Sequence, residues 1–318
     1  MTVAVASFVF LLAAVCAALM GYAIQRGATC TVAAVGEIVR EGTTKRLVAL
    51  AETSLWVAGG LLTARALGFL AAVPGGFALS GWTVLGAALL GIGAYVNKAC
   101  VFGAIAKLGS GQWAYVLTPL GFFIGAASAP LLFSQMTPAT LDTIPTSSSL
   151  PLWLAPAFLV FALWRIINIA RTDRPRGKGW QRIWAPHEAT IVIGVAFVIM
   201  FIAVGAWSYM DMLVHIVHGM SDNLFWQGLL FCALLMGAII GGWTGGVLSW
   251  QNPTLVTLAR CLLGGLLMGW GSLLIPGSND GLILIGLPFL WPYAWVSILV
   301  MCVVIWLCFI GERTFTRR

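Results

Sequence analysis

The sequence has few charged residues: Asp, Glu, Lys and Arg make up 8% of its 318 residues, whereas 60% are hydrophobic. A soluble domain carries roughly 25% charged residues. This scarcity excludes an ordinary soluble domain and predicts an all-α polytopic membrane protein that lies in the lipid bilayer. The net charge of +7 is spread between apolar runs rather than gathered in one basic tract, so no nucleic-acid partner is expected.

Motifs of several enzyme classes are also absent. The chain has no GxxxxGK[ST], HExxH or GxSxG pattern, which leaves an ATPase, a zincin and a serine hydrolase without motif support. The seven cysteines include no CxxC pair and suggest no disulfide framework. His215 and His218 are one helical turn apart, but no third metal ligand is evident. We expect no metal, no cofactor and no enzyme activity.

Long apolar runs, in contrast, are abundant. A bilayer core requires about 20 apolar residues per helix, and nine segments approach that length. The first is expected to be a retained helix, because no basic segment precedes it. The nine predicted spans are roughly 3–24, 47–70, 80–96, 112–134, 150–170, 189–210, 224–250, 257–275 and 284–310.

The basic residues predict the orientation of these spans. Most of them follow the odd-numbered spans, and Arg65 is the one basic residue at an expected outer end. Segments 135–149 and 211–223 contain no Lys or Arg. By the positive-inside rule, the N-terminus is expected outside and the C-terminus in the cytoplasm. The residues concerned are Arg40, Lys45, Arg46, Lys98, Lys107, Arg171, Arg174, Arg176, Lys178, Arg182, Arg260, Arg313, Arg317 and Arg318.

Two stretches of the chain repeat a pattern. NKACVFG (97–103) aligned with IPGSNDG (275–281) brings Cys100 onto Ser278 and Gly103 onto Gly281. Gly91 and Gly93 then match Gly269 and Gly271. Chance is one explanation, because the chain contains 37 glycines and glycine spacing also serves helix packing.

Combined with the topology, the repeat predicts two inverted halves in a single membrane transport domain that spans residues 1–318. The halves are about 1–149 and 184–318, and a connecting helix at about 150–170 joins them. Inverted repeats are typical of secondary transporters, whose sites form where broken helices of the two halves meet.

Polar residues in this setting are candidates for function. Cys100 lies near Lys98 at a predicted helix break, where a thiol can become reactive or can contact a soft anion. The alternative is that Lys98 reaches the membrane surface and Cys100 fills a gap between helices. Glu52 lies near the start of the second span, either as an intramembrane carboxylate or at the interface beside Arg46.

Three motifs together resemble a known family. The segments are GYAIQRGATC (21–30), GIGAYVNKACVFGAIAKLGSG (91–111) and RCLLGGLLMGWGSLLIPGSNDG (260–281). In this order they resemble the YeeE/YedE sulphur-transport family of bacterial inner-membrane proteins, and the resemblance covers most of the chain. Within the second half, Gly246–Leu255 is the expected counterpart of the first motif.

The resemblance implies a thiosulfate importer in which cysteines of the three motifs pass the anion along. Cys30 and Cys100 correspond to the first two, whereas the third position is Ser278, and Asn279 keeps the family residue. The resemblance also implies a small cytoplasmic TusA-like sulphur-carrier partner. A hydroxyl lacks the soft sulphur, so Ser278 leaves another small sulphur compound or anion open as the substrate.

The sequence therefore predicts an inner-membrane importer of a small sulphur-containing anion, with thiosulfate favoured. The remaining path residues are Arg26 and Lys98, which can attract anions at the cytoplasmic mouth, and Gly91, Gly93, Gly103, Gly277 and Gly281, which are expected to shape the broken helices. One alternative is a membrane sulphurtransferase or redox enzyme that uses Cys100 covalently. Another is a scaffold that docks a sulphur carrier on the basic loop 171–182.

Overall fold

The computed structural model describes residues 3–70, 75–133, 140–141, 153–172, 184–217 and 224–316, and the statements below refer to these. The side chains of His215 and His218 and the loop 173–183 lie outside this part. Its elements are α1 (Val3–Gly27), α2 (Thr31–Glu41), α3 (Lys45–Ala66), β1 (Gly76–Phe77), α4 (Gly81–Asn97), α5 (Val101–Gly109), the 3₁₀-helix η1 (Trp113–Val116), α6 (Leu117–Leu132), β2 (Thr140–Leu141), α7 (Leu154–Thr172), α8 (Pro186–Val204), α9 (Tyr209–Val217), α10 (Leu224–Thr244), α11 (Leu255–Leu274), α12 (Asn279–Gly281), the π-helix η4 (Leu282–Gly286) and α13 (Pro292–Thr316).

Eight helical segments of the described chain are long and apolar enough to cross a membrane. They coincide with eight of the nine predicted spans, which confirms an all-α polytopic membrane protein. The fifth predicted span corresponds to α7, whose apolar stretch Leu154–Ile169 is shorter than the other eight. Within the described segments, strand structure is limited to the antiparallel pair β1 and β2, with Gly76 opposite Leu141.

Local sequence explains where several long helices begin. The Ser80 side chain accepts the Thr83 N–H, and the Thr83 hydroxyl oxygen accepts the Ser80 N–H, which caps α4. α8 starts with a proline at its first position, and α11 starts after Thr254, whose hydroxyl accepts the Thr257 N–H. These caps satisfy backbone donors that would otherwise lack partners.

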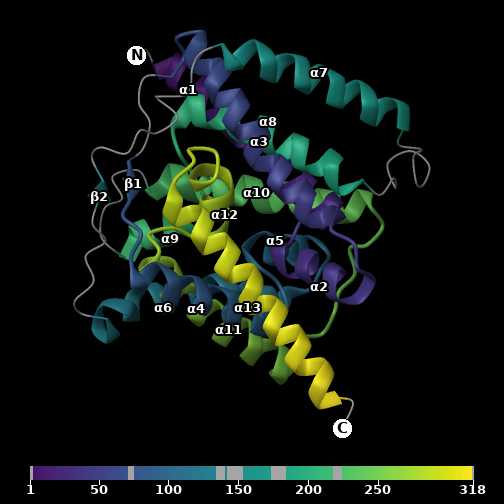
Figure 1. Cartoon of the computed structure of the whole chain (residues 1–318), viewed down its shortest axis with the longest axis vertical. Coiled ribbons are helices and arrows are strands. Elements are labelled where there is room, and N and C mark those ends of the chain that lie inside the picture. Colours follow the sequence, from purple (N-terminus) through teal and green to yellow (C-terminus); the bar gives the residue numbers. More distant parts are fainter. Residues whose placement is uncertain are drawn as a thin grey trace.

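The contacts between helices repeat when each helix of α1–α6 is replaced by the helix at the corresponding place in α8–α13. In this correspondence α1 pairs with α8, α3 with α10, α4 with α11 and α6 with α13. α1 packs on α8 and α10, and α8 packs on α1 and α3. In the same way α11 packs on α4 and α6, α4 packs on α11 and α13, α6 contacts α9, and α13 contacts α2. Figure 1 shows α7 lying apart from this bundle, across one edge of the molecule. The division into two inverted halves stays a prediction, and this pattern agrees with it.

Glycines allow α4 and α11 to approach closely. A Cβ added to Gly93 would lie 2.7 Å from the carbonyl oxygen of Gly264, and one added to Gly271 would lie 2.5 Å from the carbonyl oxygen of Gly86. Small residues permit such backbone contacts between membrane helices. Gly91 packs likewise on α13. Gly91 and Gly93 lie inside α4, which continues to Asn97, so the expectation that they shape a helix break is corrected: they are packing positions.

A buried carboxylate attaches α7 to the bundle. Glu52 on α3 accepts two hydrogen bonds from Arg165 on α7, at 2.6 Å and 2.9 Å, and contacts Nδ1 of His187 on α8 at 2.5 Å. Arg46 pairs with Glu37 instead, at 3.2 Å. Of the two alternatives for Glu52, the structure therefore favours a buried carboxylate, and its partners Arg165 and His187 come from α7 and α8.

Arg165→Ala is expected to lower the stability of the purified protein. The substitution leaves the buried Glu52 carboxylate without its bidentate partner, which costs on the order of 1–3 kcal/mol. Arg171→Ala, at an exposed position on the same helix, is the matched control. Thermal unfolding in detergent measures both, and equal melting temperatures for the two variants would contradict the role assigned to the Glu52–Arg165 pair.

Candidate functional site

Four long helices break, and each is followed by a short helix. α1 leads to α2, α4 to α5, α8 to α9, and α11 to α12. Each break contains a residue with positive φ, a conformation that ends a helix. These residues are Ala28, Lys98, Gly205 and the pair Pro276 and Gly277. Gly277, which the sequence analysis expects to shape a broken helix, lies in the break between α11 and α12 with a positive φ.

The residue that precedes each short helix is buried. These residues are Cys30, Cys100, Ser208 and Ser278, and we call the region where they lie the junction. Contacts join α12 to both α5 and α9, so short helices from distant parts of the sequence meet there. The first backbone N–H groups of a helix carry partial positive charge. The junction therefore gathers donors suited to an anion.

The thiols of two junction cysteines each accept a hydrogen bond from the backbone at the start of the helix that the other cysteine precedes. Cys30 precedes α2 and Cys100 precedes α5. The Thr31 N–H donates to Sγ of Cys100 at 3.2 Å, and the Cys100 N–H donates to Sγ of Cys30 at 3.4 Å. Sulphur is a weak acceptor, so these bonds can be exchanged at little cost. The structure brings together the two cysteines that the sequence selected.

Asn279 connects the third motif to both thiol-bearing breaks. Its Oδ1 accepts the Val101 N–H at 3.3 Å, and its Nδ2 donates to Oγ1 of Thr31 at 3.2 Å. Ser278, the preceding residue, is fully buried, and its hydroxyl donates a hydrogen bond to the carboxylate of Asp280. Ser278 and Asn279 therefore lie at the same junction as Cys100, as the repeat predicts.

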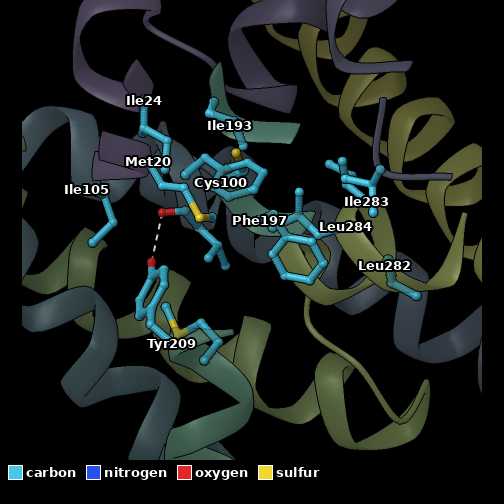
Figure 2. Close-up of a cluster of buried hydrophobic side chains, with 14 of the residues drawn as sticks. Met20, Ile24, Cys100, Ile105, Ile193, Phe197, Tyr209, Leu282, Ile283 and Leu284 are labelled. Carbon is cyan, nitrogen blue, oxygen red and sulfur yellow. Dashed lines mark hydrogen bonds between the residues drawn. The ribbon is translucent and has the colours of Figure 1, made fainter. Parts of the chain in front are cut away.

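Tyr209 closes the junction from the side of α9. Its hydroxyl donates to the carbonyl oxygen of Val101 at 2.8 Å. Figure 2 shows Tyr209 and Cys100 among buried apolar side chains that include Met20, Ile105 and Phe197. An apolar surrounding of this kind excludes water and strengthens the few polar contacts inside it.

Ser208 is a junction residue that the sequence reasoning missed. The counterpart of the first motif is Gly205-Ala-Trp-Ser208, which repeats Gly27-Ala-Thr-Cys30 at the same separation along the chain that relates Cys100 to Ser278. The expected counterpart, Gly246–Leu255, is wrong: that segment follows α10, is mostly exposed, and lies outside the four breaks. Shared spacing was the available signal, although, apart from the glycine, only one of the other three residues matches.

A basic cavity of about 930 Å³ leads to the junction, and we call it the vestibule. Cys30 and Gly103 are among its lining residues, whereas Cys100 and Ser278 are fully buried. Its basic lining residues are Arg40, Arg46, Lys98, Lys107 and Arg260, and Glu312 is its acidic one. Five basic side chains around one cavity produce a positive potential that favours anions.

The other predicted path residues lie in different surroundings. Lys98 is exposed and lines the vestibule, and its role in attracting anions stays a prediction. Arg26 does not line the vestibule, which corrects the expectation that it attracts anions at the cytoplasmic mouth. It is buried, with its guanidinium 5.9 Å from the Tyr22 ring centroid and near Gly245. Gln25 lines the vestibule instead. Gly281 is the last residue of α12 and has helical backbone angles.

Comparison with known proteins assigns the family. A model of the family described as Sulphur transport matches residues 26–307. The chain belongs to this family. It is similar to the thiosulfate transporter TsuA of Escherichia coli strain K12, with 21% identity over 92% of this chain and 91% of that protein. It is also similar to the thiosulfate transporter TsuA of Spirochaeta thermophila, with 25% identity over 67% of this chain and 72% of that protein.

Gly103 leaves room for the thiol pair of this Sulphur transport protein. A Cβ at Gly103 would lie 2.6 Å from Sγ of Cys30 and 3.1 Å from Cβ of Ala99. A clash this close forces either the thiol or α5 to shift. Gly103 therefore acts by admitting Cys30 to its position at the junction, and not through a special backbone conformation.

Gly103→Ala is expected to reduce uptake of labelled thiosulfate by about tenfold, because overpacking by one methyl costs about 1–3 kcal/mol and here displaces Cys30. Gly228→Ala is the matched control, since its Cβ would meet nothing within 4 Å. Uptake is compared at equal amounts of protein in the membrane. Unchanged uptake in Gly103→Ala would show that the position of the Cys30 thiol is unimportant.

Proposed function

We propose that this protein imports thiosulfate across the bacterial inner membrane through the junction of Cys30, Cys100, Ser208 and Ser278. The observation that carries the proposal is the placement of two thiols at the end of a basic cavity: Sγ of Cys30, which lines the cavity, accepts the Cys100 N–H, and Sγ of Cys100 behind it accepts the Thr31 N–H. The two similar transporters named for thiosulfate support the choice of substrate. The family assignment supports transport rather than catalysis.

The polar groups of the junction suit the two ends of thiosulfate. This dianion has one soft terminal sulphur and three sulphonate oxygens. Thiol S–H groups are weak donors that can contact the soft sulphur without holding it, whereas hydroxyl and amide groups bond well to oxygen. Cys30 and Cys100 supply the thiols, and Ser208 and Ser278 supply hydroxyls from the other breaks. Weak contacts in succession allow both binding and release.

Charge supports the predicted orientation. Arg40 and Arg46 flank the loop after the first span, Lys98 and Lys107 follow the third, and Arg260 follows the seventh, yet all five line one vestibule. A shared side for these residues agrees with the positive-inside rule, so the vestibule opens to the cytoplasm in this proposal. The N-terminus is then outside and the C-terminus inside.

Two inverted halves are part of the same proposal. α1–α6 form the first half and α8–α13 the second, with α7 as the connecting helix. The helix contacts support this division, because the contacts made by helices of α1–α6 are repeated by the corresponding helices of α8–α13. A site at the contact of two such halves can open to either side by movement of one half against the other.

A cytoplasmic sulphur carrier of the TusA type is the proposed recipient of the imported sulphur. The support is the resemblance to the YeeE/YedE family together with the vestibule, whose basic residues would face the cytoplasm. The vestibule also fits release of the free anion, and binding of purified carrier to the transporter distinguishes the two.

Import of a dianion requires an energy source. With the cell interior negative, moving one elementary negative charge inward costs about 2.3 kcal/mol per 100 mV, and a dianion faces roughly twice that. A cation that accompanies the anion removes part of this cost.

Cys100→Ala is expected to abolish most uptake of radiolabelled thiosulfate into cells that lack their own importers. The substitution removes the thiol that accepts the Thr31 N–H at the junction. Cys232→Ala is the matched control, because Cys232 is exposed on the outer surface of the bundle. Wild-type uptake that survives in Cys100→Ala would contradict the path, and an inactive wild type with an active Ser278→Cys would indicate a different anion.

Lys98→Gln is expected to slow thiosulfate uptake by a few fold without abolishing it. The exposed ammonium attracts the anion to the vestibule but does not contact the buried junction. Because salt screens exposed charges, the difference between wild type and variant should shrink at high ionic strength. Measuring the initial rate at two salt concentrations tests this, and a deficit independent of salt would place Lys98 in a structural role instead.

A further inference from the structure

The third motif contains an ionisable group that the path described above does not use. Asp280 has only 1% of its surface exposed, and it follows Ser278 and Asn279 directly. An ionisable side chain inside a membrane protein is costly to keep, and such groups mark proton and ion pathways. An ionised carboxylate here would also repel an anion that enters the junction.

The hydrogen bond of Ser278 depends on the protonation of Asp280. A serine hydroxyl has one proton to donate, and in the structure Ser278 donates it to Oδ1 of Asp280. A carboxylate can only accept, but a protonated carboxyl has an O–H of its own that can donate to the Ser278 oxygen. Protonation therefore reverses this hydrogen bond and frees the Ser278 proton for the anion.

We propose that Asp280 carries the proton that accompanies each imported anion, and that it acts by releasing or occupying the hydroxyl of Ser278. The proposal rests on thiosulfate import through the junction. One proton binds Asp280 from the outer side, the anion then binds to Ser278 and the thiols, and both leave to the cytoplasm. No bond of the anion is broken, and one positive charge moves inward per dianion.

The surroundings favour Ser278 as the group that responds. Tyr209 on α9 interacts electrostatically with Asp280, but its hydroxyl proton is donated to Val101. The side chain of Asn279 is already hydrogen-bonded to the Val101 N–H and to the Thr31 hydroxyl. Cys100, at the start of α5, is the other ionisable group described near Tyr209, and η4 contains none.

The inference also gives a reason for serine where the family pattern has cysteine. A thiol is a weak donor and a weak acceptor, so it would respond little to a neighbouring carboxyl. A hydroxyl responds strongly, because both directions of its hydrogen bond to Asp280 are good. By thermodynamic reciprocity, protonation that strengthens anion binding means that anion binding also promotes proton uptake, so binding tightens as pH falls.

The test uses the purified wild-type protein in liposomes, with labelled thiosulfate outside and the membrane potential clamped at zero. An inward gradient of about one pH unit is expected to drive about tenfold accumulation, because a proton ratio and an anion ratio of equal size represent the same free energy. Asp280→Asn keeps a donor for Ser278, so it should retain downhill uptake and lose accumulation. Glu41→Gln, at an exposed position, should accumulate as the wild type does.

The outcomes separate the two proposals. No wild-type uptake at any pH overturns thiosulfate import itself. Wild-type uptake that ignores the pH gradient, or accumulation that persists in Asp280→Asn, overturns the coupling role alone.

If Asp280→Asn does not fold, the proposal is tested instead by measuring the binding of thiosulfate to the Ser278→Ala variant. This variant should bind more weakly than the wild type at acidic pH, where the wild-type hydroxyl is free, and similarly at alkaline pH. An equal deficit at both pH values overturns the switch.

Discussion

Backbone N–H groups at the start of a helix must find partners, and inside a membrane protein water cannot supply them. This constraint governs the centre of the molecule, where four short helices begin in buried positions. The Thr31 N–H is satisfied by Sγ of Cys100 and the Val101 N–H by Asn279, while the Cys100 N–H donates to Sγ of Cys30. The breaks support one another, so the junction depends on all of them.

The same arrangement prepares the junction for an anion. Its donors are partly occupied by soft or neutral acceptors, which an anion can replace without leaving a charge exposed to lipid. Sulphur is the weakest of these acceptors. In the proposed path, the thiols hold the structure together when no anion is bound and release their hydrogen bonds when an anion arrives. Basic side chains remain in the vestibule, where water still screens them and the anion is not trapped.

The two parts of the chain contribute different chemistry to equivalent places. The breaks after α1 and α4 end in thiols, whereas those after α8 and α11 end in hydroxyls. A soft anion with an oxygen-rich end can be held between such unlike sides. The hydroxyl of Ser278 has an additional property, because it shares its proton with a buried carboxylate. In the proposed coupling, this hydrogen bond links anion binding at Ser278 to the protonation of Asp280, two residues further along the chain.

The sequence alone determined the membrane class, the positions of the spans, and the three motifs with Cys30, Cys100 and Ser278, because apolar length and motif spacing are local properties of the chain. It did not reveal Ser208 as the fourth break residue, the burial of Arg26, or the packing role of Gly91 and Gly93. These depend on which helices lie side by side. Only the tertiary structure brought the thiols within hydrogen-bonding distance of each other's helices and gathered distant basic residues around one cavity, because those contacts join segments far apart in the chain.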